Sequence, residues 1–163
     1  MKSFTVFLCT LAATALAQTT RPFKVIVETP ELPMFAPIYL AADGSVTSSE
    51  ADGAAVRIVD GELFVAGSTV PVGAGTNTWE TRLLPLQGLD SINPRWSIDE
   101  ENHLQWVNGR FPYGAARFVY GEGREDFPRP AVYAELGPAP EGEDHSGELT
   151  TPANLLVYVP PNW

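Results

Sequence analysis

The chain has 163 residues and an acidic composition, with ten Lys and Arg against twenty Asp and Glu and a formal net charge of −10. This balance excludes nucleic acid and anionic membrane surfaces as partners, because both require clustered basic side chains. The single cysteine, Cys9, excludes a disulfide framework and a thiolate metal site.

The first 17 residues have the layout of a secretory signal peptide. Met1-Lys2-Ser3 is a short basic start, an almost unbroken apolar run follows at 4–16, and Ala15-Leu16-Ala17 is a small-x-small cleavage site. The apolar run is too short to remain as an anchor across a bilayer. We therefore expect export and cleavage before Gln18, which would leave 18–163 as a single secreted domain outside the cell or in the cell wall.

The remainder reads as an all-β domain. Helical periodicity is nearly absent, and fifteen prolines and fourteen glycines interrupt almost every window that is long enough for a helix. The polar segments 42–53 and 137–147 are expected to be surface loops. Short runs rich in Val, Ile, Phe, Tyr and Trp predict strands at 23–28, 37–41, 55–59, 62–66, 79–84, 95–99, 103–107, 115–120, 131–136 and 154–160.

Two pairs of these runs predict hairpins with similar sequences. Asp60-Gly61 accepts the positive φ of a two-residue turn, and a longer polar loop at 99–102 joins the second pair. Alternation puts Trp96 and Trp106 on one apolar face, so both are predicted core residues. The hairpins recur about forty residues apart, and a weaker Gly-Glu-Leu follows at 147–149. This repeat suggests a β-trefoil-like barrel, and a β-sandwich of short antiparallel hairpins is the open alternative.

Patterns for catalysis and metal binding are weak. His103 and His145 lack partners at metal-ligand spacing, and no Gly-x-Ser-x-Gly elbow occurs. Twenty acidic residues produce neighbouring carboxylates by chance, so such neighbours alone do not indicate catalysis. We therefore expect no catalytic residue, no metal site and no cofactor. Paired carboxylates of the kind that flank a sugar in glycosidases are the remaining option. The candidates are Asp60 with Glu62, Asp99 with Glu100 or Glu101, and Glu122 with Glu125 and Asp126.

Aromatic and arginine side chains outside the predicted core supply the candidate ligand site. Trp79 and Trp163 have polar neighbours, and the loop 108–114 holds Arg110 and Tyr113 close together. Trp and Tyr rings have an apolar face and a polar edge, which suits the stacking of sugars. The predicted ligand-binding residues are therefore Trp79, Arg110, Tyr113 and Trp163. The alternative for the loop is a tight connection plugged by Phe111 and Tyr113.

Two segments near the start, PFKVIVE at 22–28 and APIYLAADG at 36–44, resemble small fungal secreted cell-wall proteins of the phialide type (PhiA-like). The resemblance covers 22–44. The chain departs from that pattern in lacking cysteines after the leader, and its connector ETPELPMF at 28–35 does not match. The resemblance implies a non-enzymatic protein of the fungal cell wall or culture fluid, and it transfers no catalytic residue.

These features together favour a secreted, non-catalytic protein that is associated with a cell wall or released from it. Contact with a cell-wall polysaccharide is its expected activity. A secreted effector or antigen acting on a host protein is the first alternative. A glycoside hydrolase that uses a carboxylate pair is the second.

Overall fold

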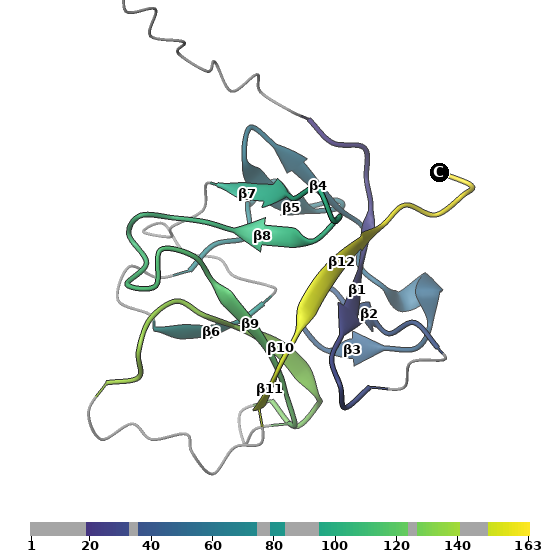
Figure 1. The fold of residues 1–163 in the computed structure, drawn as a ribbon. Helices are drawn as coiled ribbons and strands as arrows, with labels where there is room; N and C mark the ends of the chain where they lie inside the picture. Colours follow the sequence, from purple (N-terminus) through teal and green to yellow (C-terminus); the bar gives the residue numbers. More distant parts are fainter. Residues whose placement is uncertain (1–18, 33–35, 75–78, 84–94, 124–126, 141–149) are drawn as a thin grey trace, which may run out of the picture.

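The structure, a computed structural model, describes residues 19–32, 36–74, 79–83, 95–123, 127–140 and 150–163. These residues form an all-β fold whose only described helix is a single 3-10 turn, η1 (Glu50–Asp52). The strands, drawn in Figure 1, are β1 (Lys24–Glu28), β2 (Tyr39–Leu40), β3 (Val46–Thr47), β4 (Val56–Val59), β5 (Glu62–Val65), β6 (Glu80–Arg82), β7 (Trp96–Ile98), β8 (Leu104–Trp106), β9 (Arg117–Gly121), β10 (Ala131–Glu135), β11 (Thr150–Pro152) and β12 (Asn154–Tyr158).

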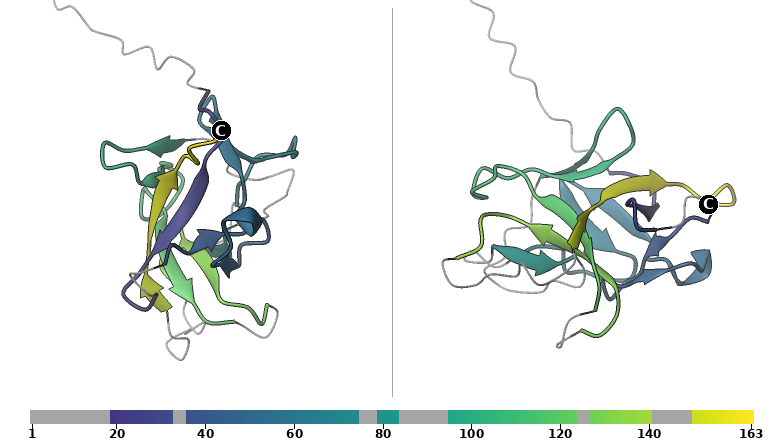
Figure 2. Two further views of the ribbon diagram at one scale, coloured as in Figure 1. Left: turned by 90° about the vertical axis from the view of Figure 1, so that its right-hand side faces the viewer. Right: turned by 60° about the horizontal axis from the view of Figure 1, so that its bottom comes forward.

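The strands pair into two four-stranded antiparallel sheets and two hairpins. The sheet orders are β12-β1-β2-β3 and β11-β9-β10-β6, and the hairpins are β4-β5 and β7-β8. The hairpins lie at one end of the molecule and the β9-β10 sheet at the other, with the β1-β12 ribbon running between them (Figures 1 and 2). All ten predicted strands are therefore confirmed, with ends that differ by at most two residues.

Both predicted hairpins form in the expected register. Val56 pairs with Val65, and Trp96 pairs with Trp106. Asp60 and Gly61 have φ values of 54° and 80°, which is the two-residue turn that their sequence predicts. No sheet of the described strands closes on itself. The fold is therefore a sandwich of short hairpins, and the trefoil-like barrel is the wrong alternative. A closed barrel needs one continuous ladder of hydrogen bonds, whereas these strands are divided among two sheets and two hairpins. The Gly-Glu-Leu at 147–149 lies outside the described residues.

The predicted loop 42–53 contains structure that its polar composition hides. β3 pairs with β2 through Thr47 opposite Tyr39, and η1 follows directly. Asp43 organises the turn between the two strands, because its Oδ1 accepts a hydrogen bond of 3.0 Å from the backbone N–H of Ser45. β11 was also not predicted. Both missed strands are only two or three residues long, too short for alternation to show.

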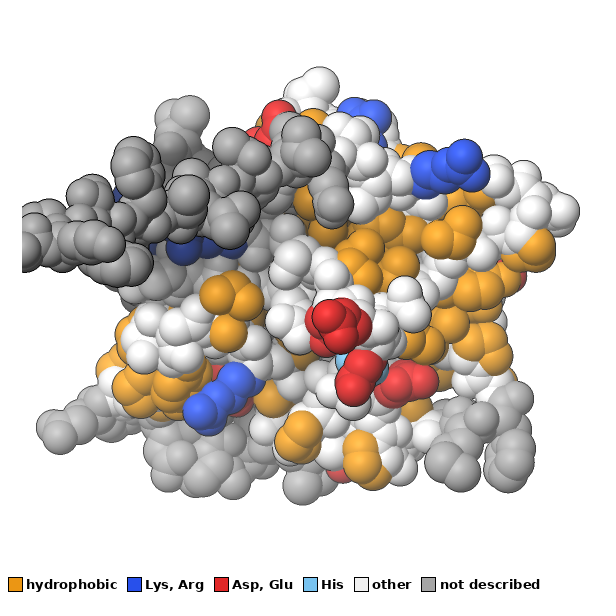
Figure 3. All heavy atoms as spheres, turned by 45° about the horizontal axis from the view of Figure 1, so that its top comes forward, with side chains coloured by type: hydrophobic (Ala, Val, Ile, Leu, Met, Phe, Trp, Pro, Cys, Tyr) orange, Lys and Arg blue, Asp and Glu red, His pale blue; other side chains and the backbone are white. Residues whose placement is uncertain are grey.

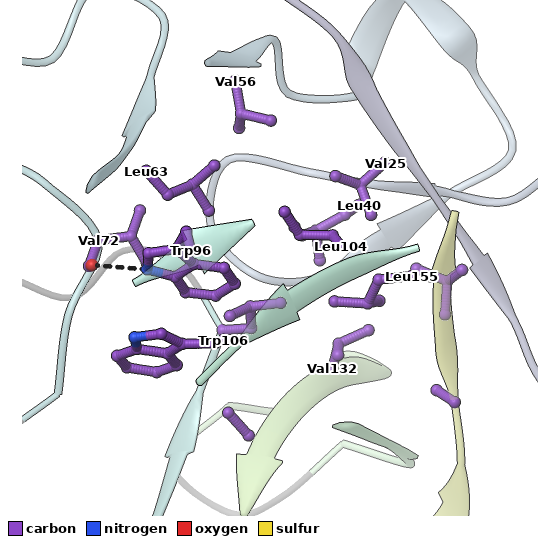
Figure 4. Packing of buried hydrophobic residues seen from close by; sticks show 14 of the residues in the cluster. Val25, Leu40, Val56, Leu63, Val72, Trp96, Leu104, Trp106, Val132 and Leu155 are labelled. Carbon is purple, nitrogen blue, oxygen red and sulfur yellow. Dashed lines mark hydrogen bonds between the residues drawn. The ribbon is translucent and has the colours of Figure 1, made fainter. Parts of the chain in front are cut away.

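The core joins side chains from the sheets and the hairpins (Figure 4). The indoles of Trp96 and Trp106 stack with ring centroids 4.6 Å apart, and Phe111 meets Trp106 edge-on at 4.9 Å. The Trp96 Nε1–H lies 3.4 Å from the carbonyl oxygen of Val72, which gives one indole a polar partner. Both tryptophans are almost completely buried, so their predicted place in the core is confirmed.

Candidate functional site

The turn between β7 and β8 is organised by one carboxylate. Asp99 Oδ1 accepts hydrogen bonds from the backbone N–H groups of His103 (2.8 Å) and Glu101 (3.0 Å). Its Oδ2 accepts a bond of 2.6 Å from Gln105 Nε2. Asn102 completes the turn with a φ of 65°, a conformation that asparagine tolerates better than most residues. The result is a rigid polar edge that starts at the turn and continues along β8.

The pKa of Asp99 is lowered from its ordinary value. The largest cause is the hydrogen bond from the backbone N–H of His103, and the bonds from Glu101 and Gln105 and the nearby charge of His103 act in the same direction. Nδ1 of His103 lies 3.6 Å from Asp99 Oδ2 and 3.6 Å from Glu101 Oε2. A carboxylate held by donors in this way stays ionised and is suited to accept hydrogen bonds rather than to donate a proton.

This edge forms one wall of a groove of about 570 Å³. The opposite wall is the start of β9, and residues of β11 and β12 close one end. The bridge of Val107 with Ala115 joins the two walls, and the bridge of His103 with Leu156 joins the β8 wall to β12. We call this feature the β8–β9 groove. The polar side chains of the residues that line it are those of Asp99, His103, Gln105, Arg117, Glu135 and Asn154.

An aromatic ring stands beside the β8–β9 groove. The guanidinium of Arg117 lies 4.0 Å from the ring centroid of Tyr113, and the ring is 37% exposed. Arg117 is also the register partner of Glu135 on β10. The loop that carries Tyr113 is fixed to the end of this strand by a hydrogen bond of 3.2 Å from the Tyr113 N–H to the carbonyl oxygen of Leu136. An arginine is thus stacked on a tyrosine where it can reach into the groove.

The four predicted ligand-binding residues occupy two separate places. Tyr113 and Arg110 share the exposed loop beside the β8–β9 groove, although neither of them lines it. Trp79 is half-buried behind the same loop, and its carbonyl oxygen accepts the N–H of Leu136 at 2.6 Å. Trp163 lies across the molecule from this loop (Figure 1 and the right-hand view of Figure 2), with its ring 5.6 Å from Lys24 Nζ. The structure therefore gathers three of the four and separates Trp163 from them.

The loop 108–114 was interpreted from sequence either as part of a ligand site or as a tight connection plugged by its aromatic residues, and it has features of both. Phe111 is 4% exposed and packs on Trp106 as a plug, whereas Tyr113 remains at the surface. Prediction from sequence missed Gln105, Arg117, Glu135 and Asn154. The first two could have been identified as polar side chains on the outward positions of alternating strands, but nothing in the sequence indicates that β8, β9, β10 and β12 meet at one groove.

Figure 3 shows one face of the molecule, on which acidic side chains gather around a histidine beside a band of hydrophobic side chains.

The described residues contain no group of three or more His, Cys, Asp or Glu side chains that could hold a metal ion. Likewise, no helix within the described ranges is long and apolar enough to cross a membrane. His145, Glu125 and Asp126, named above as candidates, lie outside the described residues.

Comparison with known protein families identifies the family to which the chain belongs. Residues 37–125, more than half of its length, match the family described as a domain of unknown function (DUF7908), and the chain belongs to this family. The matched segment runs from just before β2 to just after β9, so it includes both hairpins and both walls of the β8–β9 groove. Glu135 and the lining residues of β11 and β12 lie outside the match. No curated protein and no solved structure is significantly similar to the chain.

Proposed function

We propose that this protein is a secreted, non-catalytic glycan-binding protein whose β8–β9 groove holds the sugar. The observation that carries the proposal is the composition of the groove: planar amide, carboxylate and guanidinium groups on strand positions, with an exposed tyrosine at the side. Sites of this kind bind a hydroxyl-rich ligand by pairing its donors and acceptors with a few well-placed polar groups.

Each wall offers a different part of that chemistry. Asp99 holds the Gln105 amide in place, so the remaining amide positions are presented without rotational freedom, which lowers the entropy lost on binding. Arg117 is held on Tyr113 and can donate to sugar oxygens as a fixed planar fork. Val107, which is exposed, and Ala115, which is half-buried, also line the groove and offer apolar contact for C–H faces.

The setting that we propose is the cell wall or the extracellular medium of a fungus. The leader at 1–17 and the PhiA-like segments at 22–44 support it, and the net charge of −10 suits an extracellular soluble protein. Expression with the native leader tests the export step. The intact mass of the protein recovered from the medium should correspond to a chain that starts at Gln18, and a mass that includes 1–17 would contradict export by cleavage.

The binding step is tested with purified 18–163 and insoluble chitin, β-glucan and mannan. We expect depletion from solution by one of the polymers and no release of reducing sugar. Gln105→Ala should weaken binding by about three- to tenfold, the effect of one lost hydrogen bond. Ser97→Ala is the matched control, because Ser97 is the exposed cross-strand partner of Gln105 and does not line the groove. No depletion by any polymer would overturn the proposal and direct the search to a host protein.

One observation favours hydrolysis as a second candidate function. Asp99 and Glu135 both line the β8–β9 groove, so two carboxylates face the same space. The lowered pKa of Asp99 suits a nucleophile or an electrostatic stabiliser and would leave Glu135 as the proton donor. Release of reducing sugar that disappears in Glu135→Gln would establish hydrolysis in place of simple binding.

A further inference from the structure

The outer face of the β1-β12 ribbon has an apolar pair at its centre, between polar residues at its ends. Val25, Val27 and Leu155 point into the core and are buried. Because side chains alternate along a strand, Ile26 of β1 and its register partner Leu156 of β12 point the other way. Both are half-buried, and both line a groove together with residues of the turn after β1 and of the segment before β2. Neighbouring loops must therefore cover part of this face.

Those loops turn the face into a groove. The turn after β1 contributes Pro30 and Leu32, and the segment before β2 contributes Pro37 and Ile38, which together with Ile26 and Leu156 enclose about 1030 Å³. We call this the β1–β12 groove. Pro152 and Asn154 line both grooves, so the two adjoin at the start of β12. A concave, mostly apolar space of this size is characteristic of small-molecule sites.

Polar groups are confined to one end of the β1–β12 groove. Glu28 is the only charged residue among those that line it, and it pairs in register with Asn154. Thr29 Oγ1, at the same end, is buried and has no hydrogen-bond partner in the described part of the chain. A buried hydroxyl without a partner is uncommon in folded proteins, and a rotation about the Cα–Cβ bond of Thr29 would be needed to turn it toward a ligand in the groove.

From these contacts we propose that the β1–β12 groove binds an apolar small molecule with a neutral or cationic polar end. The apolar body packs on Ile26, Leu156 and Ile38, and the polar end lies at Glu28, Thr29 and Asn154. A negatively charged end group would meet the Glu28 carboxylate and the field of a protein with net charge −10. This function goes beyond glycan binding, because its apolar floor at Ile26, Leu156 and Ile38 takes no part in the β8–β9 groove, although the two grooves share Pro152 and Asn154.

The test uses purified 18–163 with Nile red, an uncharged apolar fluorophore, displaced in turn by hexadecan-1-ol, hexadecylamine and palmitate below their micelle concentrations. We expect saturable Nile red binding that the alcohol and the amine displace. Palmitate should require a concentration about tenfold higher, as expected for an unfavourable contact with one carboxylate. Glu28→Gln, a change at an exposed residue, should abolish this difference. Palmitate displacing as well as the amine would overturn the proposal.

A second pair of variants locates the binding. Ile26→Gln places an amide on the apolar floor and should weaken Nile red binding by about tenfold or more, because it removes apolar contact and buries a polar group. Val70→Gln is the matched control, since Val70 is 42% exposed and lies outside the groove. If Ile26→Gln unfolds, Ile38→Gln on the covering segment replaces it. No Nile red binding by the unchanged protein, or equal binding by the folded groove variants, would contradict the proposal.

Discussion

At the scale of single residues, the two kinds of aromatic side chain in this chain have separate roles. Trp96, Trp106 and Phe111 form a stacked and edge-on cluster inside the core. Tyr113, two residues after Phe111, is exposed and carries Arg117 on its ring. The short loop between β8 and β9 therefore connects this aromatic cluster directly to the proposed glycan site, and the packing of Phe111 in the cluster fixes the loop that carries Tyr113.

Trp106→Ala should cause a large loss of stability. Its side chain is completely buried, so the substitution leaves a cavity beneath Trp96 and Phe111, and losses of about 3–5 kcal/mol are typical for such changes. The free energy of unfolding measured in urea checks this value. Val107→Ala, at the next position on the exposed face, should stay within about 0.5 kcal/mol of the unchanged protein. A loss below 1 kcal/mol for Trp106→Ala would show that the indole is not a core residue.

Asp99→Asn should remove a pH-dependent part of the stability. The folded pKa of Asp99 is below its ordinary value, so its contribution is present above the unfolded pKa and is lost as the pH falls through the folded pKa. The unfolding midpoint of the unchanged protein should therefore exceed that of Asp99→Asn at pH 6, and the difference should shrink as the pH is lowered past the ordinary pKa of an aspartate. Urea midpoints across this range provide the measurement. A difference that stays constant with pH would contradict the lowered pKa.

At the scale of elements, turn chemistry determines where the strands reverse. Gly61 has a φ of 80°, and the β4-β5 turn that contains it also provides the carbonyl that accepts the Trp96 N–H at 2.8 Å. The turn therefore connects the two hairpins as well as closing one of them. This explains why two hairpins with similar sequences pack as neighbours without belonging to a closed barrel.

Gly61→Ala should destabilise the fold by about 1–2 kcal/mol, because an L-residue is strained at this φ and its Cβ would approach the Arg95 nitrogen to 3.4 Å. Gly109→Ala is the matched control, since Gly109 has no positive φ and a Cβ there would meet nothing within 4 Å. Thermal unfolding of both variants gives the comparison. Equal midpoints for the two would refute the role of the Gly61 turn.

Local sequence predicted the elements well because each strand carries its own alternation and each hairpin its own turn residues. Trp96 and Trp106 were assigned to the core on that basis. β3 could not be predicted, since one of its ladder contacts is the N–H of Val46 to the carbonyl of Pro130, far along the chain. The β8–β9 groove was missed for the same reason. Gln105, Arg117 and Asn154 come together only through the order of the strands.

At the scale of the whole molecule, β12 divides two unlike surfaces. The β8–β9 groove on one side is polar and includes acids, an amide and an arginine. The β1–β12 groove on the other side is apolar with a single carboxylate at its end. The chain as a whole has a net charge of −10, which favours neutral or cationic ligands in both grooves.

The most direct measurement of the central claim is a titration of ¹⁵N-labelled 18–163 with soluble oligosaccharides of chitin, β-glucan and mannan, followed by amide chemical shifts. We predict saturable shifts from one of the three that cluster at 99–107, 113–119 and 152–155, with Gln105→Ala weakening them and Ser97→Ala leaving them unchanged. Saturable shifts confined to other surfaces, or none with any of the sugars, would contradict a glycan site in the β8–β9 groove.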